Sequence, residues 1–287
     1  MLLVDAFVDT TRGRAIVHTG KLVYDVGMCR GEDTEFYLSR GCRVVGVEAN
    51  PVLVASLREK FAAELERGLL HIVDKAISNS PGRVRLAIYP TAKSWGSISE
   101  KFKERNATLG LVPEEVDVEA VTFDDVLREF GVPYYLKVDI EGLDMVCIEA
   151  LHRFSARPSY VSLETSATTG ASSADDGFSE LAQLWVLGYR GFKYIEQASL
   201  RKLNGTLLRS EGSPIDYMHR EGSSGPFGEE TPGTWQGIDE AARQMRKLVR
   251  HQNRFGLGGL NSHRLPSKII RRLRRIRHFW YDLHARL

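Results

Sequence analysis

Acidic residues stand near the ends of predicted strands, where a small ligand would bind. Asp25 lies in a strand predicted over residues 21–26, two residues before Gly27 and six before Gly31. A dinucleotide site carries G-x-G-x-x-G there, because the backbone must approach a pyrophosphate closely. A carboxylate would instead repel a pyrophosphate and attract the ammonium of an amino acid. S-adenosylmethionine has that ammonium, a sulfonium and no phosphate, so we expect it as cofactor; a plain strand-to-helix turn is the alternative.

Two more carboxylates follow the next two predicted strands. Glu48 ends the strand over 42–48, where an acid can accept hydrogen bonds from ribose hydroxyls. NAD and S-adenosylmethionine both contain that ribose, so Glu48 does not separate them. Asp74 ends the strand over 69–74 and could accept from an adenine amino group, with a loop cap as the alternative.

A second group of acids follows the fourth and fifth predicted strands. Asp139 and Glu141 end the strand over 134–140, and Glu164 ends the strand over 159–164. Ligands bind beyond the carboxyl ends of parallel strands, so the three should lie together as candidate catalytic residues. One of them could be a general base whose pKa is raised by burial and by its neighbours. Alternatives are a Mg²⁺ site, which we do not expect, or pairing with a basic residue such as Lys137.

The elements that position these residues alternate along the chain. The five strands named above are separated by helical segments, and Asn50-Pro51 supplies a helix cap and a first-turn proline. Short links between alternating strands and helices indicate parallel strands with right-handed crossovers. The predicted fold is therefore α/β, a doubly wound, mostly parallel sheet. Residues 190–196 and 214–219 are expected to pair as its last two strands.

Several stretches of the sequence resemble the FkbM family of S-adenosylmethionine-dependent methyltransferases. The most specific is Lys137-Val-Asp-Ile-Glu-Gly142, and the resemblance covers roughly residues 21–200. The other matching stretches are Tyr24-Asp-Val-Gly27, Val47-Glu-Ala-Asn-Pro51, Ala76-Ile-Ser78, Val121-Thr-Phe-Asp-Asp125 and Tyr160-Val-Ser-Leu-Glu164.

The resemblance implies a class I, Rossmann-like methyltransferase fold with a seven-stranded sheet whose last strand is antiparallel. It also implies methyl transfer to oxygen, typically a hydroxyl of a natural product, a glycan or another small molecule; the acceptor itself does not carry over. The residues expected to bind the cofactor are Asp25, Gly27, Met28, Gly31, Glu48, Ala49, Asn50, Asp74, Ala76 and Asp139.

Other functions compete with O-methylation. N-methylation of a small-molecule amine is one, and a membrane-associated binding module that retains the fold is another. Base-modifying nucleic-acid methyltransferases usually carry an Asn/Asp-Pro-Pro-aromatic motif after the fourth strand, whereas this chain has Asp139-Ile-Glu-Gly142. Trp95 could contact the cofactor or the acceptor, or belong to the core. His284, preceded by Asp282, is a further candidate base.

Composition places the chain among ordinary globular proteins. Of its 287 residues 43% are apolar and 26% charged, which argues against disorder. We find no apolar run long enough to span a membrane and no signal peptide. The three cysteines lack metal-site spacing and fit a reducing compartment. We therefore expect a cytoplasmic protein.

The charge is concentrated at the C-terminus. Residues 264–287 hold eight Lys and Arg and one Asp, and the spacing of their apolar residues predicts a basic amphipathic helix. This helix could pack on the protein or in a homodimer, bind an anionic surface at the inner membrane, or, less in keeping with the motifs, bind nucleic acid. The expected organisation is a cofactor-binding domain over 1–221, an acceptor-side loop and helix over 222–263, and this helix.

Overall fold

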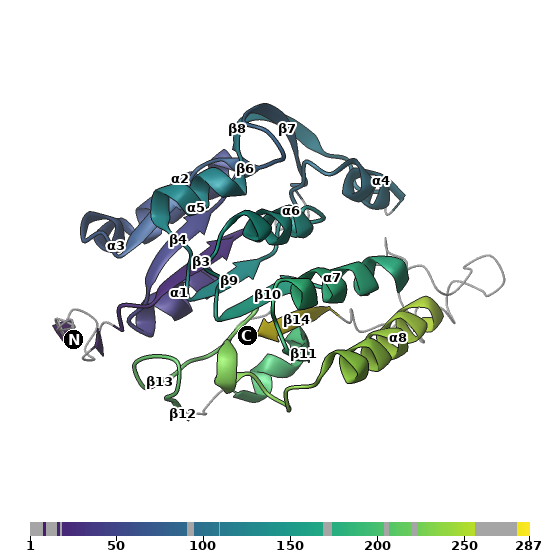
Figure 1. The fold of residues 1–287 in the computed structure, drawn as a ribbon. Coiled ribbons are helices and arrows are strands. Elements are labelled where there is room, and N and C mark those ends of the chain that lie inside the picture. Colours follow the sequence, from purple (N-terminus) through teal and green to yellow (C-terminus); the bar gives the residue numbers. More distant parts are fainter. Residues whose placement is uncertain are drawn as a thin grey trace, which may run out of the picture.

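A seven-stranded sheet forms the centre of the computed structural model, which describes residues 8–9, 16–17, 19–90, 95–108, 110–168, 174–203, 207–219, 223–255 and 280–287 (Figure 1). Its strands, in spatial order, are β11 (Gly191–Glu196), β14 (Tyr281–Arg286), β10 (Tyr160–Glu164), β9 (Tyr135–Val138), β3 (Leu22–Val26), β4 (Arg43–Val47) and β5 (Leu70–Val73). The pairs from β10 to β5 are parallel, and β14 is antiparallel to both of its neighbours. The predicted α/β fold with one antiparallel strand is confirmed.

The antiparallel strand comes from a different segment than the sequence predicted. Residues 214–219 do not join the sheet: β12 (Leu207–Leu208) and β13 (Ile215–Asp216) form a separate hairpin. The helix predicted over 264–287 is wrong at its end, because β14 occupies 281–286 and inserts between β10 and β11. The rest of that predicted helix, up to residue 279, lies outside the described residues. Leu283 and Ala285 alternate with Asp282 and His284, which is strand periodicity.

Helices cover one face of the sheet with a large apolar layer (Figure 1). They are α5 (Phe123–Phe130), α6 (Asp144–Ala150), α7 (Ala174–Val186) and α8 (Ile238–Phe255). The side chains of Ala241, Met245 and Val249 bury one stripe of α8, so the helix predicted there from apolar spacing is confirmed.

The other face is covered by α1 (Glu32–Ser39), by α2 (Pro51–Lys60) and by the chain between 207 and 231. Asn50 caps α2 through its side-chain oxygen, which accepts from the amide of Val52 at 3.0 Å. The remaining short elements are β1 (Val8–Asp9), β2 (Ile16–Val17), α3 (Ala62–Glu66), η1 (Leu151–Arg153), η2 (Gln197–Leu203) and η3 (Gly228–Glu230).

A small second sheet stands near the carboxyl ends of the central strands. It consists of β6 (Ala76–Ile77), β8 (Glu114–Val121) and β7 (Gly82–Ile88), with α4 (Glu100–Thr108) beside it (Figure 1). Leu86 of β7 and Arg105 of α4 line the pocket described below, so this sheet supplies one of its walls.

The loop predicted on the acceptor side, at the start of 222–263, is rich in Gly and Pro, and its residues 223–228 are buried in the core. None of the described residues of 222–263 lines the pocket. The carboxylate of Asp33 in α1 accepts from the hydroxyl of Ser223 and from the amides of Ser224 and Gly225. Phe227 stacks on Tyr135 of β9 with ring centroids 4.2 Å apart. Residues 223–228 therefore pack against α1 and β9 on this face of the sheet.

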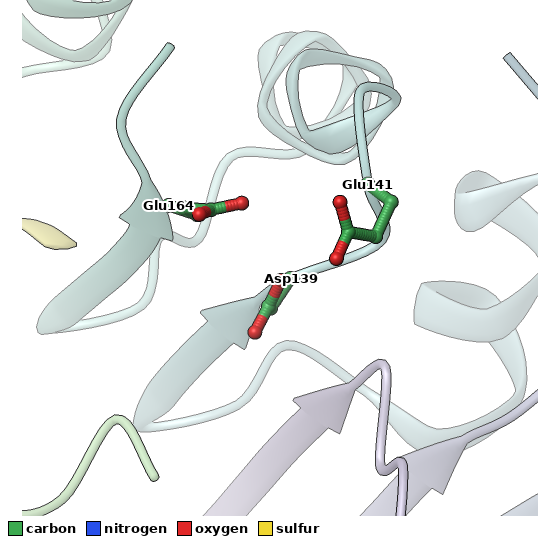
Figure 2. Close-up of side chains that lie close together, drawn as sticks. All are labelled: Asp139, Glu141 and Glu164. Atoms are coloured by element: carbon green, nitrogen blue, oxygen red, sulfur yellow. The ribbon is translucent and has the colours of Figure 1, made fainter. Parts of the chain in front are cut away.

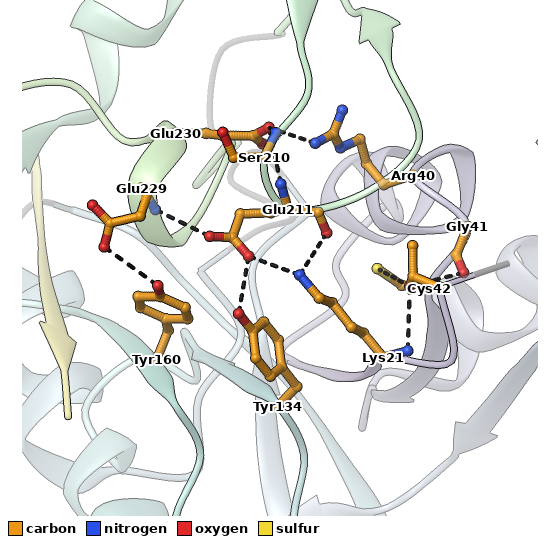
Figure 3. A network of polar contacts seen from close by, with 11 residues as sticks. Lys21, Arg40, Gly41, Cys42, Tyr134, Tyr160, Ser210, Glu211, Glu229 and Glu230 are labelled. Carbon is orange, nitrogen blue, oxygen red and sulfur yellow. Dashed lines mark hydrogen bonds and ion pairs between the residues drawn. The ribbon is translucent and has the colours of Figure 1, made fainter. Parts of the chain in front are cut away.

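A buried polar network connects residues 208–213 and Glu230 to the end of α1 and to the residues that precede β3 and β9 (Figure 3). The guanidinium of Arg40 donates to the carbonyls of Leu208 and Ser213 and to the carboxylate of Glu230 at 2.5 Å. The carboxylate of Glu211 accepts from Lys21 and from Tyr134. Because these charged side chains are paired, burying them leaves no isolated charge in this network.

Among the described helices, none has both the length and the apolar character required to cross a membrane.

Replacing Phe227 by alanine tests whether this segment is structural. Phe227 is 1% exposed, so the truncation removes a fully buried ring and should lower the free energy of unfolding by about 3–5 kcal/mol. Urea denaturation measures the loss. Val112→Ala, at an exposed position, is the control and should change stability by less than about 0.5 kcal/mol. Equal stability of the two variants would mean that the segment does not contribute to the core.

Candidate active site

A pocket opens at the carboxyl ends of β3, β4, β9 and β10. Its lining includes Gly27, Met28 and Cys29 after β3, and Glu48, Ala49 and Asn50 after β4. It also includes Asp139 and Glu141 after β9 and Glu164 at the end of β10. This is where ligands bind in open parallel sheets, and most residues predicted for the site, Ala76 among them, meet here.

The turn after β3 brings backbone close to the pocket. Gly27 has φ +89°, and a Cβ there would collide with the carbonyl oxygen of Asp139. The amides of Gly27 and Met28 both donate to the carbonyl of Val47, at 2.9 and 3.1 Å. Only glycine fits both the backbone conformation and the contact. Gly31 also has positive φ, but it packs against α2 and does not line the pocket.

Asp25 does not face the pocket, which corrects the sequence prediction. Its carboxylate is fully buried, accepts from the hydroxyl of Thr34 at 2.7 Å, and lies 3.0 Å from the ammonium of Lys137. Burial raises the pKa of Asp25, and the ammonium opposes that shift. The carboxylate does attract an ammonium, but that ammonium belongs to the protein.

Glu48 is held in place by backbone amides. One carboxylate oxygen accepts from the amide of Cys29 at 2.9 Å and the other from the amide of Asn50 at 2.8 Å. Burial raises its pKa, while these hydrogen bonds favour the ionised form. A fixed carboxylate on the pocket wall suits the hydroxyls of a ribose. Asp74 does not reach the pocket: it is half-exposed and pairs with Arg58 at 3.0 Å.

Asp139, Glu141 and Glu164 form a cluster of carboxylates whose nearest oxygens lie within 4.8 Å of one another (Figure 2). β9 ends at Val138, so Glu141 is placed by a turn and not by strand alternation. Glu141 has φ +53°, and its carbonyl accepts from the hydroxyl of Ser97 at 2.7 Å. Asp144 closes the turn by accepting from the amides of Ile140 and Gly142.

The three carboxylates differ in their cationic neighbours. Lys137 lies 3.9 Å from Asp139, and Arg105 lies 3.7 Å from Glu141. Within the described part of the chain no ion pair reaches Glu164. Burial raises the pKa of Glu141 and of Glu164 well above the ordinary value, and the neighbouring carboxylates add to the rise. Such a cluster can accept a proton or, with its oxygen ligands, hold a divalent cation.

The far side of the pocket is aromatic. Trp95 and Trp280 meet edge to face with centroids 6.4 Å apart, and the guanidinium of Arg105 lies 5.1 Å from the ring of Trp95. Gln197 completes this side. Trp95 thus lines the pocket, where it can contact the cofactor or the acceptor, the first of the two roles predicted for it. Sequence reasoning missed Arg105 and Gln197, which stand in no motif, and placed Trp280 on a helix face.

His284, considered as a base, is buried in β14 away from the pocket. Burial lowers its pKa to about 3, and Lys193 adds to that shift. An imidazole that stays neutral and has no route to the pocket does not serve as the base.

The comparison with protein families decides the identity. Residues 25–194 match the model of the methyltransferase FkbM domain, which is more than half of the chain. The chain belongs to the FkbM methyltransferase family. It is a family of S-adenosylmethionine-dependent methyltransferases, and S-adenosylmethionine is the cofactor of this enzyme. The residues present fit that cofactor, because Gly27 leaves room for close approach and the fixed carboxylate of Glu48 lies on the pocket wall.

Several solved structures are similar to the chain at low identity. An FkbM methyltransferase from Methylobacillus flagellatus KT is 14% identical, with a TM-score of 0.41 over 62% of this chain and 40% of that one. The chain thus spans about two fifths of the length of that protein. A S-adenosyl-L-homocysteine complex of a methyltransferase from Geobacter sulfurreducens is 12% identical, with a TM-score of 0.37 over 94% and 84%. No curated protein matches the chain.

A methyl group added at Gly27 should weaken binding of the cofactor strongly. In Gly27→Ala the new Cβ meets the carbonyl of Asp139, so the turn must shift out of the pocket. We expect the Kd for S-adenosylmethionine, measured by calorimetry, to rise at least about 100-fold, which is about 2.7 kcal/mol.

Gly96→Ala is the matched control for this substitution. Gly96 also lines the pocket, but a Cβ there meets its nearest atom at an ordinary 3.6 Å. Its affinity should stay close to that of the unmodified enzyme. Tight binding by Gly27→Ala would show that the cofactor does not approach this turn.

Proposed function

We propose that the enzyme transfers a methyl group to a hydroxyl oxygen of a small molecule, natural product or glycan. The observation that carries this proposal is the carboxylate cluster of Asp139, Glu141 and Glu164 between the cofactor-binding turn and the aromatic side of the pocket. A hydroxyl must lose its proton as it becomes an ether, and a carboxylate of raised pKa is a suitable acceptor. The proposal rests on the FkbM membership for the methyl donor and on this cluster for the acceptor.

Glu164 is the general base in this proposal. It has no ion-pair partner among the described residues, whereas Lys137 lies 3.9 Å from Asp139 and Arg105 lies 3.7 Å from Glu141. Burial and the neighbouring carboxylates raise the pKa of Glu164 well above the ordinary value, which suits a proton acceptor. When bound, S-adenosylmethionine supplies an activated methyl group on its sulfonium. Glu164 would take the proton of the acceptor hydroxyl as the methyl group is displaced from the sulfonium to that oxygen. Trp95 and Trp280 orient the acceptor for this in-line displacement.

N-methylation of an amine is the second candidate, and a specific feature favours it. The acceptor side combines two tryptophan rings with carboxylates, an arrangement that attracts cations. The two functions are separated by testing matched acceptors that differ only in a hydroxyl or an amine at one position. Turnover with labelled cofactor on the alcohol supports O-methylation, and turnover on the amine alone supports the second candidate.

Glu164→Gln should remove most of the activity without removing cofactor binding. Loss of a general base lowers kcat by about 10²–10⁴-fold. Glu66→Gln, an exposed position outside the pocket, is the control and should be fully active. An active Glu164→Gln enzyme would assign the base to another group.

The pH profile of the unmodified enzyme gives an independent test. A base works only when ionised, and the pKa of Glu164 lies well above the ordinary glutamate value. The rate kcat/KM should therefore be low in acid and rise with pH through an apparent pKa that lies above the ordinary value of about 4.3. A rate that is already constant from about pH 4.5 upward contradicts a base of raised pKa.

Chelation distinguishes a side-chain base from a metal. Three carboxylates within 4.8 Å could bind Mg²⁺, which would acidify a bound hydroxyl instead. We expect dialysis against EDTA to leave kcat unchanged, because Glu164 accepts the proton directly. Loss of activity that is restored by Mg²⁺ would replace this base by a metal.

A further inference from the structure

Lys137 is a buried cation that the proposed proton transfer does not use. Its side chain is 4% exposed, yet it lines the pocket beside Gly27 and Asp139. Its ammonium lies 3.0 Å from the carboxylate of Asp25 and donates to the carbonyl of Gly27 at 2.8 Å. Asp139 lies at 3.9 Å, beyond hydrogen-bond distance. An ammonium has three N–H donors, so one remains for a ligand in the pocket.

The pocket needs a cation at this point. The methionyl end of S-adenosylmethionine carries a carboxylate as well as an ammonium, and carboxylates crowd the pocket. A ligand carboxylate is stable there only beside a positive charge. Three cationic side chains line the pocket, as far as the described residues go: Lys75, Arg105 and Lys137.

Two of these cations are placed elsewhere. Lys75 pairs with Glu119 at 3.1 Å on the side of the small sheet, and Arg105 is stacked on the aromatic side near Glu141. With the ribose at Glu48, the methionyl end would extend along the turn at Gly27, and Lys137 donates to the carbonyl of that glycine.

We propose that Lys137 binds the carboxylate of the methionyl group of S-adenosylmethionine. Asp139, whose side chain is 27% exposed and lines the same pocket, takes the ammonium of that group. The buried carboxylate of Asp25 then acts through Lys137: it fixes the position of the ammonium and does not touch the cofactor. Lys137 is thereby a cofactor-binding residue, and Asp25 is a positioning residue.

A pair of ligands tests this directly on the unmodified protein. Decarboxylated S-adenosylmethionine keeps the ammonium and the sulfonium but lacks the carboxylate. Calorimetry without any acceptor should show that it binds about 10- to 100-fold more weakly than S-adenosylmethionine, the difference made by one charge-assisted hydrogen bond. Equal affinities overturn the proposal. Because no acceptor is present, this result is independent of which atom the enzyme methylates.

Two variants assign the discrimination to Lys137. Removing Lys137 alone would leave Asp25 buried without its cationic partner, so the comparison is made in the background Asp25→Asn, whose amide oxygen can still accept from Thr34. In Asp25→Asn the ammonium of Lys137 loses its ion pair but keeps its hydrogen bond to Gly27, so a reduced preference for S-adenosylmethionine should remain. Asp25→Asn with Lys137→Met should bring the ratio of the two affinities to about one. A ratio unchanged in the double variant means that Lys137 only supports the fold.

Circular dichroism and thermal melting establish that both variants are folded before binding is measured. If the double variant does not fold, Lys137→Arg and Lys137→Gln replace it. The arginine variant should retain the preference for the carboxylated ligand because it retains the charge, and the glutamine variant should lose it. The same ratio in both variants would contradict a role for the charge at position 137.

Discussion

The ion pair between Asp25 and Lys137 links the two central strands at the point where the pocket begins. The two residues are direct neighbours in the register of β3 and β9, so the parallel pairing itself brings them together. Lys137 also donates to the carbonyl of Gly27, which ties the glycine turn to β9. A buried ion pair adds little net stability, but removing one partner costs about 3–5 kcal/mol. Its contribution is therefore to specify where the strands, the turn and Asp139 lie relative to one another.

Parallel strands present their carboxyl ends at one edge of a sheet, and this rule was enough to predict most of the site from the sequence. Glu48, Asp139, Glu141 and Glu164 meet in one pocket although they are far apart in the chain. The rule failed for Asp25, which lies inside β3, two residues before Gly27, where the lining of the pocket begins. Electrostatics alone predicted that Asp25 would attract an ammonium. It could not show that a lysine on the neighbouring strand supplies it, because that depends on register.

The strand β14 could not be predicted from the local pattern of apolar residues. Leu283 fits a helical stripe with residues before it and also a strand alternation with Ala285, and a segment of six residues does not decide between the two. The strand is selected by its long-range partners: β14 lies between β10 and β11 and pairs with residues 160–164 on one side and 191–196 on the other. Likewise, nothing in the sequence of residues 223–228 indicates that they pack against Asp33 and Tyr135, which are distant in the chain.

Charge distribution around the cluster connects the methyl donor to the proposed base. Asp139 and Glu141 each have a cation within 4.0 Å, whereas Glu164 has none among the described residues. A sulfonium bound in this pocket near Glu164 would favour the ionised form of that acid, since an opposite charge within about 4–6 Å lowers the pKa of an acid. By linkage, ionisation of the acids strengthens binding of the sulfonium to the same extent. In the proposed mechanism, the charge that makes the methyl group reactive would thus also prepare Glu164 to accept a proton. After methyl transfer the sulfur would be neutral and Glu164 protonated, and both changes would weaken the attraction between the acids and the cofactor, which favours release of the product.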